Sequence, residues 1–103
     1  MRETPESLGE LLAVLKVLGS ETRLRILSML AERPMHAYEI MKELGVSYPI
    51  VLMHLNALRR VGLVEEAEAE RGGRRRKYYR AVSFRLVLTP EVIREVVEGG
   101  GTE

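Results

Sequence analysis

The spacing of apolar residues predicts four helices in the first 60 residues. Hydrophobic positions recur every three or four residues in 8–18, 21–31, 36–44 and 47–60, which is the period of an amphipathic helix. Each segment is bounded by residues typical of helix ends. The first helix starts either at Thr4-Pro5 or at a capping box formed by Ser7 and Glu10. The other boundary residues are Gly19, Ser20, Pro34, His36, Gly45, Ser47 and Gly62.

After residue 62 the pattern changes, and residues 63–70 and 75–82 predict two strands. They flank Gly72-Gly73, which is a permissive two-residue hairpin turn. Pairing Arg71 with Arg74 brings opposite charges together, which supports this register. The opposed residues are Glu70 and Arg75, Glu68 and Lys77, and Glu65 and Arg80.

The C-terminal part predicts one more helix and leaves one segment open. Residues 84–88 are apolar enough for a short third strand or an extended connector. Thr89-Pro90 then starts a last helix. We expect residues 1–103 to form a single domain, with 1–6 as a loose N-terminal arm and 99–103 as a frayed tail.

The first and last helices carry more apolar surface than one small domain can cover. Apolar surface left over on a small domain usually meets a partner, so we expect a homodimer. The residues predicted to form its interface are Leu8, Leu11, Leu12, Leu15, Leu18, Val92, Ile93 and Val96.

The composition excludes several classes of function. The chain of 103 residues has no cysteine, so it has neither a disulfide framework nor a thiolate metal site. The two histidines, His36 and His54, are a poor metal set, and no glycine-rich phosphate loop precedes a helix. We therefore expect no catalytic residues, no metal and no cofactor. No apolar run is long enough to span a membrane and no secretory signal is visible, so we expect a cytoplasmic protein.

The choice of charged residues is also informative. All 15 acidic residues are glutamate, arginine outnumbers lysine by 13 to 3, and Asn56 is the only asparagine. Few thermolabile side chains and a high capacity for ion pairs are typical of thermophile proteins. We therefore expect a thermophilic, archaeal source.

Basic residues gather in the second predicted strand although the net charge is only +1. Residues 71–80 contain six cations and no acid. Two interpretations remain open: contact with nucleic-acid phosphates, or pairing of the cations with glutamates of residues 65–70. The residues predicted to contact DNA from this hairpin are Arg71, Arg74, Arg75, Arg76 and Lys77.

Short helices with tight turns followed by a charged hairpin are the arrangement of a winged helix-turn-helix. In this fold one helix, here about 47–60, enters the major groove, and the hairpin, here about 70–80, lies on the backbone or in the minor groove. The outward positions of this helix have few hydrogen-bond donors for base edges. They are Ser47, Tyr48, Pro49, Ile50, Met53, Asn56 and Arg60.

The sequence resembles two families of winged-helix regulators. Leu18-Gly19-Ser20-Glu21-Thr22-Arg23-Leu24-Arg25-Ile26-Leu27, with His54-Leu55 and Val61-Gly62-Leu63-Val64, resembles the ArsR family. Pro34-Met35-His36-Ala37-Tyr38-Glu39-Ile40, with Lys77-Tyr78-Tyr79-Arg80, resembles the PadR family. The C-terminal helix is too short for the dimerisation region of PadR proteins, which favours the ArsR family.

The resemblance implies a mainly α fold with a small β-hairpin wing, about five helices and two to three strands. It also implies a homodimeric transcriptional regulator that binds double-stranded DNA and is not an enzyme. The ligand sets of metal-sensing ArsR members are absent here, so metal sensing is not implied. Two alternatives stay open because the outward helix face is apolar: a module that binds an unidentified protein partner, and a chromatin-like DNA binder of low specificity.

Two further side-chain positions follow from the predicted elements. His54 precedes the core residue Leu55, and we expect it to pack where the third and fourth helices meet. Tyr78 and Tyr79 point to opposite faces of their strand, so one is in the core and the other exposed.

Overall fold

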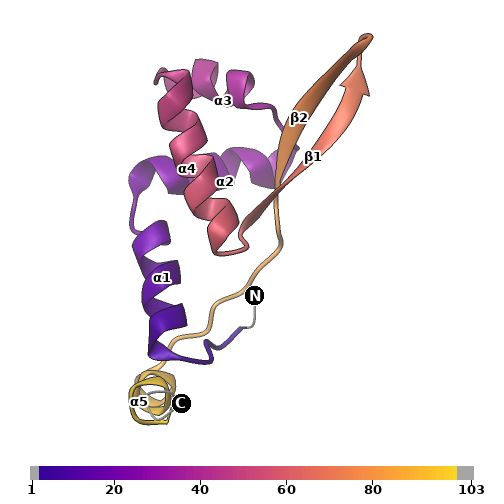
Figure 1. The fold of residues 1–103 in the computed structure, drawn as a ribbon. Helices are drawn as coiled ribbons and strands as arrows, with labels where there is room; N and C mark the ends of the chain where they lie inside the picture. The colour runs from indigo at the N-terminus through magenta and orange to yellow at the C-terminus, as the bar shows by residue number, and fades with distance from the viewer. Residues whose placement is uncertain (1–2, 100–103) are drawn as a thin grey trace.

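The chain folds into four helices, a β-hairpin and a last helix (Figure 1). The computed structural model describes residues 3–99. This mainly α architecture with a hairpin is the predicted winged helix-turn-helix, and residues 84–88 form an extended connector rather than a third strand. The elements are α1 (Leu8–Leu18), α2 (Glu21–Glu32), α3 (Ala37–Leu44), α4 (Tyr48–Arg60), β1 (Val64–Arg71), β2 (Arg74–Ala81) and α5 (Pro90–Glu98).

Local hydrogen bonds set the predicted ends of the helices. The Ser7 hydroxyl accepts from the Glu10 N–H at 3.1 Å, so α1 begins after Ser7 and not at Pro5. Ser20 caps α2 in the same way. Gly45 ends α3 in the left-handed conformation at a φ of 71°, which glycine adopts without strain. Ser47 occupies the N-cap of α4 but makes no side-chain capping bond, contrary to expectation.

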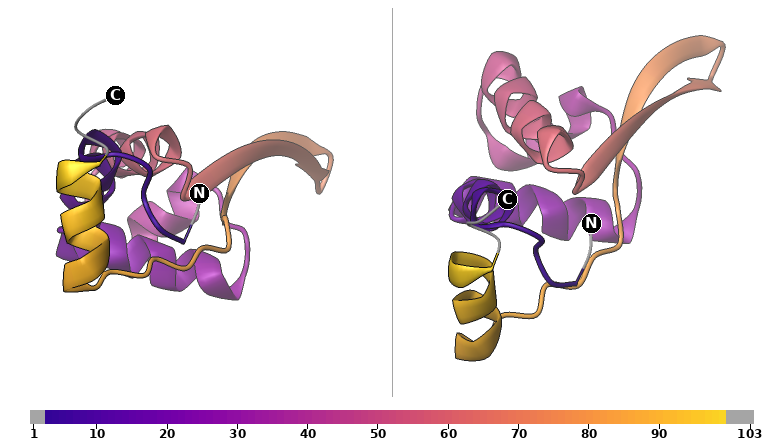
Figure 2. Two further views of the ribbon diagram at one scale, coloured as in Figure 1. Left: turned by 90° about the horizontal axis from the view of Figure 1, so that it is seen from below. Right: turned by 60° about the horizontal axis from the view of Figure 1, so that its bottom comes forward.

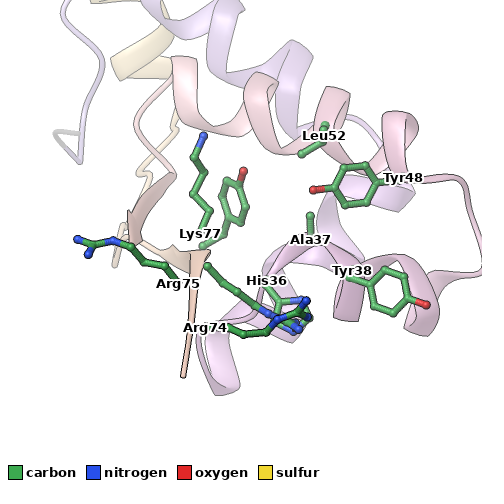
Figure 3. A pocket seen from close by; sticks show the side chains of 10 residues that line it. His36, Ala37, Tyr38, Tyr48, Leu52, Arg74, Arg75 and Lys77 are labelled. Carbon is green, nitrogen blue, oxygen red and sulfur yellow. The ribbon is translucent and has the colours of Figure 1, made fainter. Parts of the chain in front are cut away.

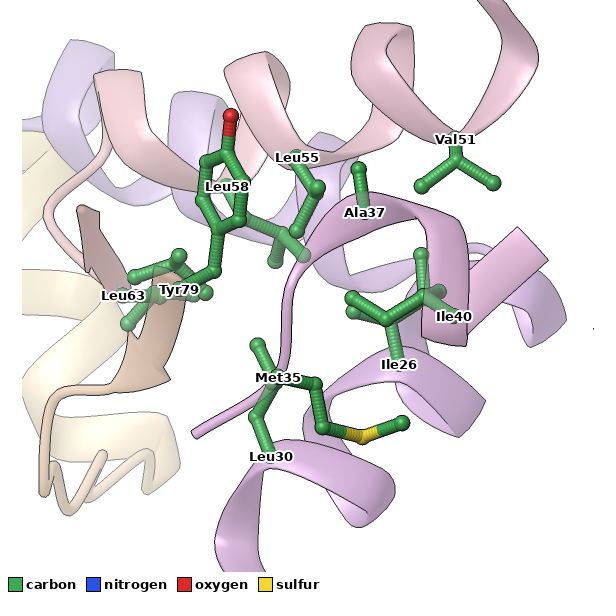
Figure 4. Packing of buried hydrophobic residues seen from close by; sticks show 11 residues of the cluster. Ile26, Leu30, Met35, Ala37, Ile40, Val51, Leu55, Leu58, Leu63 and Tyr79 are labelled. Carbon is green, nitrogen blue, oxygen red and sulfur yellow. The ribbon is translucent and has the colours of Figure 1, made fainter. Parts of the chain in front are cut away.

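The core lies between α2, α3, α4 and the base of the hairpin (Figure 4). It consists of the inward stripes of the three helices together with the start of β1. Tyr79, which is 4% exposed, brings its ring into this core, so of the two strand tyrosines Tyr79 is the core residue. Fully buried members are Ile26, Ile40, Val51, Leu55, Leu58 and Leu63.

The hairpin has the predicted register, with Arg71 opposite Arg74 and Glu65 opposite Arg80. Gly72 and Gly73 have φ values of 58° and 75°, as a tight hairpin turn requires. Glu65 pairs with Arg80 as expected.

Glu70 and Arg75, and Glu68 and Lys77, are also opposite one another as predicted, but the ion pairs of these two cations go to other glutamates. Arg75 pairs with Glu68 at 3.1 Å instead of Glu70, and Lys77 lies 4.0 Å from Glu66 instead of pairing with Glu68. Both contacts are diagonal, because long side chains on a twisted ribbon reach the neighbour two residues away.

Backbone hydrogen bonds attach the base of the hairpin to the helices. The N–H and C=O of Tyr79 both pair with Met35, in the segment between α2 and α3, at 2.8 and 3.0 Å. The Val82 N–H donates to the Leu63 carbonyl at 2.9 Å. The direction of β2 is thereby fixed relative to α3 and α4.

The segments near the two termini are joined to each other. Glu3, which we expected in a loose arm, accepts a backbone hydrogen bond from Val87 at 2.8 Å and lies 3.6 Å from Arg85. The rest of the predicted arm and tail, residues 1–2 and 100–103, lies outside the described residues. The views in Figures 1 and 2 place α5 beside α1, at the opposite end of the molecule from the hairpin tip. None of the helices in the described part of the chain is long and apolar enough to cross a membrane.

Candidate nucleic-acid interface

An open hollow of about 850 Å³ lies between the starts of α3 and α4 and the outer part of β2 (Figure 3). Its β2 side is cationic, whereas its helical side is largely aromatic and apolar. The lining residues are His36, Ala37, Tyr38, Tyr48, Leu52, Arg74, Arg75, Arg76, Lys77 and Tyr79. A strip of positive charge therefore runs beside the N-terminal half of α4.

The structure places every predicted α4 contact residue at the surface. Tyr48, Ile50 and Met53 are 45%, 41% and 49% exposed, so these large apolar side chains face outward. Val51, Leu55 and Leu58 fill the core from the opposite side of the helix. The remaining predicted contact residues, all exposed, are Ser47, Pro49, Asn56 and Arg60.

The exposed residues of α4 fall into stripes with different surroundings. Tyr48 and Leu52 line the hollow and so face the hairpin. At 3.6 residues per turn, Ile50 lies on the flank away from the hairpin, while Met53 and Asn56 lie between the two flanks. The expected apolar pair Ile50 and Met53 is thus solvent-exposed but spreads over two stripes.

A network of polar contacts connects the end of α4 to the hairpin, and the sequence did not reveal it. Arg59 Nη1 donates to Asn56 Oδ1 at 3.2 Å, and Arg59 Nη2 lies 3.4 Å from Glu66 Oε1. Glu66 also lies 4.0 Å from Lys77 and opposite Tyr79 in the hairpin register. Burial raises the pKa of Tyr79, and the neighbouring negative charge of Glu66 raises it further. The sequence feature that could have predicted this network is the pair of opposite charges, Arg59 and Glu66, on either side of Gly62.

His36 joins the start of α3 to β2. Its Nδ1 accepts from the Glu39 N–H at 3.3 Å while the Glu39 carboxylate accepts from the His36 N–H at 3.0 Å, forming a capping box. His36 Nε2 lies 2.8 Å from Arg76 Nη1. Although burial raises the pKa of Glu39, the His36 backbone hydrogen bond and the charges of His36 and Arg33 lower it overall. His36 therefore lies between the capping box of α3 and the cationic strand.

The cations of the hairpin divide into two groups. Arg75, Lys77 and Arg80 lie near glutamates of β1, as the pairing interpretation expects. Within residues 3–99 no carboxylate pairs with the other three, which are Arg71, Arg74 and Arg76. Arg71 lies over the Tyr78 ring at 4.7 Å, and Arg74 lines the hollow. Positive charge thus remains uncompensated near the tip.

His54 does not lie where the sequence indicated. Its Nδ1 accepts from Arg23 Nε at 3.1 Å, so it packs at the contact of α4 with α2 and not with α3. Burial lowers the pKa of His54, and the positive charge of Arg23 lowers it further. Its position on the flank of α4 gave no indication of which neighbouring helix it would meet.

The apolar surface of α1 and α5 is smaller than predicted. Leu11 and Val96 are each 4% exposed within the chain, so these two predicted interface residues offer little area to a partner. Leu12, Leu15 and Ile93 remain 51%, 40% and 44% exposed. Leu8, Leu18 and Val92 are half-buried.

Comparisons with known proteins identify the family of the chain. The sequence model of the family described as "Bacterial regulatory protein, arsR family" matches residues 20–66. An uncharacterized HTH-type transcriptional regulator of Methanocaldococcus jannaschii is 34% identical over 83 residues, which are 81% of this chain and 87% of the relative. The chain belongs to the ArsR family of transcriptional regulators. The prediction that it is not an enzyme is thereby confirmed.

Solved structures of several other proteins have the same fold. A regulator from a Rhodococcus species has a TM-score of 0.65 at 36% identity, covering 72% of this chain and 64% of the other. HlyU in its reduced form from Vibrio cholerae has a TM-score of 0.61 at 28% identity, covering 85% and 82%. The homodimeric winged helix-turn-helix DNA-binding domain of a possible ArsR-family regulator from Mycobacterium bovis has a TM-score of 0.64 at 29% identity, covering 86% and 73%.

Proposed function

We propose that this ArsR-family protein binds duplex DNA with α4 in the major groove and the hairpin along the phosphate backbone. The observation that carries the proposal is the hollow between α4 and β2, which sets a cationic strand beside an exposed helix. The major groove is about 12 Å wide and admits one helix, so a neighbouring strand of cations meets the phosphates at its rim.

Within this arrangement the residues divide by role. We assign Tyr48, Ile50, Met53 and Asn56 to the base edges, where the apolar side chains among them contact thymine methyl groups. Contacts to phosphates set the position of the protein on the duplex without reading sequence. The residues assigned to the backbone are Ser47, Pro49, Arg60, Arg71, Arg74, Arg75, Arg76 and Lys77.

We further propose that the protein acts as a homodimer through the exposed faces of α1 and α5. Leu12, Leu15 and Ile93 supply apolar area that the chain itself leaves open. The homodimeric domain from Mycobacterium bovis supports a dimer for this fold. Leu8, Leu18 and Val92 are half-buried and Leu11 and Val96 are buried, so these five residues offer less area to a partner.

A second candidate function rests on the apolar character of α4. Tyr48, Ile50 and Met53 are large, exposed and poor in hydrogen-bonding groups, which also suits the surface of a protein partner. A third, low-specificity binding by the hairpin alone, rests on its uncompensated arginines. The three functions differ in how DNA affinity depends on sequence and on salt.

Selection of bound duplexes from a random pool at two salt concentrations tests the proposal. A regulator selects one sequence that it binds at least about 10³-fold more tightly than random duplex at the same salt. A low-specificity binder shows a steep salt dependence and enriches no sequence. A protein-interaction module retains no duplex at either salt concentration.

The double variant Ile50→Ala with Met53→Ala separates the roles of α4. We expect it to weaken binding to the selected duplex by about 1–3 kcal/mol, the scale of losing a base contact, and to leave random-duplex binding unchanged. Equal affinity of variant and wild type for the selected duplex would assign this face to a protein partner.

The source of the protein is a separate proposal. The absence of Asp and Gln and the excess of arginine over lysine support a thermophilic source, and the relative from Methanocaldococcus jannaschii supports an archaeal one. A midpoint of thermal unfolding well above about 65 °C, the upper end for mesophile domains, is the expected result.

A further inference from the structure

Asn56 is the only exposed residue in the middle of α4 with an amide side chain, and Arg59 holds that amide in one orientation. Arg59 Nη1 donates to Asn56 Oδ1 at 3.2 Å. A guanidinium only donates hydrogen bonds, so the oxygen of the amide must face Arg59 and the NH₂ group must face away from it.

Arg59 is itself fixed from the other side. Its Nη2 lies 3.4 Å from Glu66 Oε1, in a contact where the two side chains are 38% and 26% exposed. Glu66 lies opposite Tyr79 in the hairpin register, and the ring of Tyr79 lies in the core. The orientation of Asn56 is therefore determined by a chain of contacts that ends in the core of the protein.

This orientation changes which base Asn56 can recognise. A free asparagine pairs with adenine through two bonds, donating to N7 and accepting from the N6 amino group. Here the oxygen already accepts from a cation, so an incoming amino group would have to approach beside the Arg59 charge. Guanine presents two acceptors, N7 and O6, to the major groove. The outward NH₂ group of Asn56 can donate to this edge without using its oxygen.

We propose that Asn56, oriented by Arg59 and Glu66, acts as a donor to the N7 and O6 edge of guanine and disfavours adenine at that base pair. This inference rests on the proposed placement of α4 in the major groove. Arg59 is then a positioning residue that sets the base preference of its neighbour instead of contacting phosphate.

Selection from a random duplex pool, repeated with three variants, tests the inference. Asn56→Ala identifies the base pair that Asn56 contacts, because the base preference at that position of the selected duplex disappears in this variant. Arg59→Ala frees Oδ1, so we expect the preference at that position to move from guanine to adenine. One bidentate contact corresponds to a change of between about 5-fold and about 150-fold in the affinity ratio of the two bases.

Arg60→Ala is the matched control, because it removes the same charge from the next residue of α4. Arg60 is exposed, and no hydrogen bond joins it to Asn56 in the described structure. We expect this variant to lose affinity for all duplexes and to keep the preference for guanine at the Asn56 position. Thermal unfolding of each variant, followed by circular dichroism, verifies that the fold is retained.

Three results would overturn the inference. They are a wild-type preference for adenine at the Asn56 position, an unchanged guanine preference in Arg59→Ala, and an equal shift in both arginine variants. Each leaves the proposed function intact, since the wild type still selects a sequence. Failure of the wild type to retain any duplex would instead refute the proposed function and the inference together.

Discussion

Arg23 connects three helices through hydrogen bonds of one side chain. From α2, its Nε donates to His54 on α4 at 3.1 Å, and its Nη1 donates to the carbonyl oxygens of Val17 and Lys16 at 3.4 and 3.5 Å, near the end of α1. The first bond requires a neutral His54, since a protonated imidazole has no acceptor. Arg23 and His54 therefore link the packing of the helices to pH.

His54 makes stability depend on pH. Burial and the Arg23 charge lower its pKa in the folded chain, so the unfolded chain takes up this proton first and protonation favours unfolding. The stabilisation is complete above the unfolded value, near 6.5, and decreases as pH falls below it. We expect the midpoint of thermal unfolding to fall more between pH 7.5 and 5.5 in the wild type than in His54→Gln. Parallel decreases in the two proteins would contradict this.

Removing Arg23 tests the connection itself. Arg23→Ala loses three hydrogen bonds, and we expect it to lower the free energy of unfolding by about 1–3 kcal/mol. Arg25→Ala on the same helix is the control, because within residues 3–99 Arg25 makes only a surface pair with Glu21, and its loss should cost less than about 0.5 kcal/mol. Urea denaturation measures both, and equal losses would show that Arg23 adds nothing beyond a surface charge.

At the scale of elements, the hairpin depends on contacts made at its two ends. Its base is held by the backbone pairing of Tyr79 with Met35, while its tip turns at Gly72 and Gly73. Between these points β2 carries cations into the hollow beside α4. Because β2 is already fixed, it needs no further ordering when its cations contact DNA, and this reduces the entropic cost of binding.

Substitution of Arg74 tests how much the hairpin contributes to DNA affinity. It lines the hollow, and the described part of the structure shows no carboxylate paired with it. We expect Arg74→Ala to weaken binding to all duplexes alike and to reduce the slope of log affinity against log salt by about 0.9. Arg85→Ala, on the connector, should leave affinity and slope unchanged. An unaltered slope for Arg74→Ala would remove the hairpin tip from the interface.

The elements themselves were predictable because their signals are local. Capping residues, glycine at helix ends and the Gly72-Gly73 turn each act within a few residues, and the hairpin register followed from them. Contacts between elements were not predictable in the same way. Arg59 and Glu66 meet only because the chain turns at Gly62, and His54 lies on a helix flank that two different helices could have covered.

At the scale of the whole molecule, the hairpin tip and the proposed dimer surface lie at opposite ends. The chain extends over 53 Å in its longest dimension and 24 and 21 Å in the others. Figure 1 shows the hairpin tip at one end and α1 with α5 at the other. Changes in the dimer surface can therefore be made without touching the proposed DNA interface.

The dimer is tested with exposed residues only. Leu12→Glu with Leu15→Glu places charge on the open face of α1, and we expect monomers in sedimentation at micromolar concentration where the wild type is dimeric. Leu24→Glu on α2 replaces an equally exposed leucine, 51% like Leu12, and should stay dimeric. A folded wild-type monomer at this concentration would refute the dimer.

The open hairpin also exposes strand edges that other copies could join. The outer edges of β1 and β2 carry unpaired N–H and C=O groups, to which a strand of another copy could pair. On the β2 edge, the described structure pairs Met35 with Tyr79. Glutamates along β1 and arginines along β2 oppose like-with-like pairing of two hairpins. Each arginine removed to probe DNA contact therefore also weakens the protection of the chain against aggregation, and light scattering of such variants will show how much of the solubility of the protein depends on this hairpin.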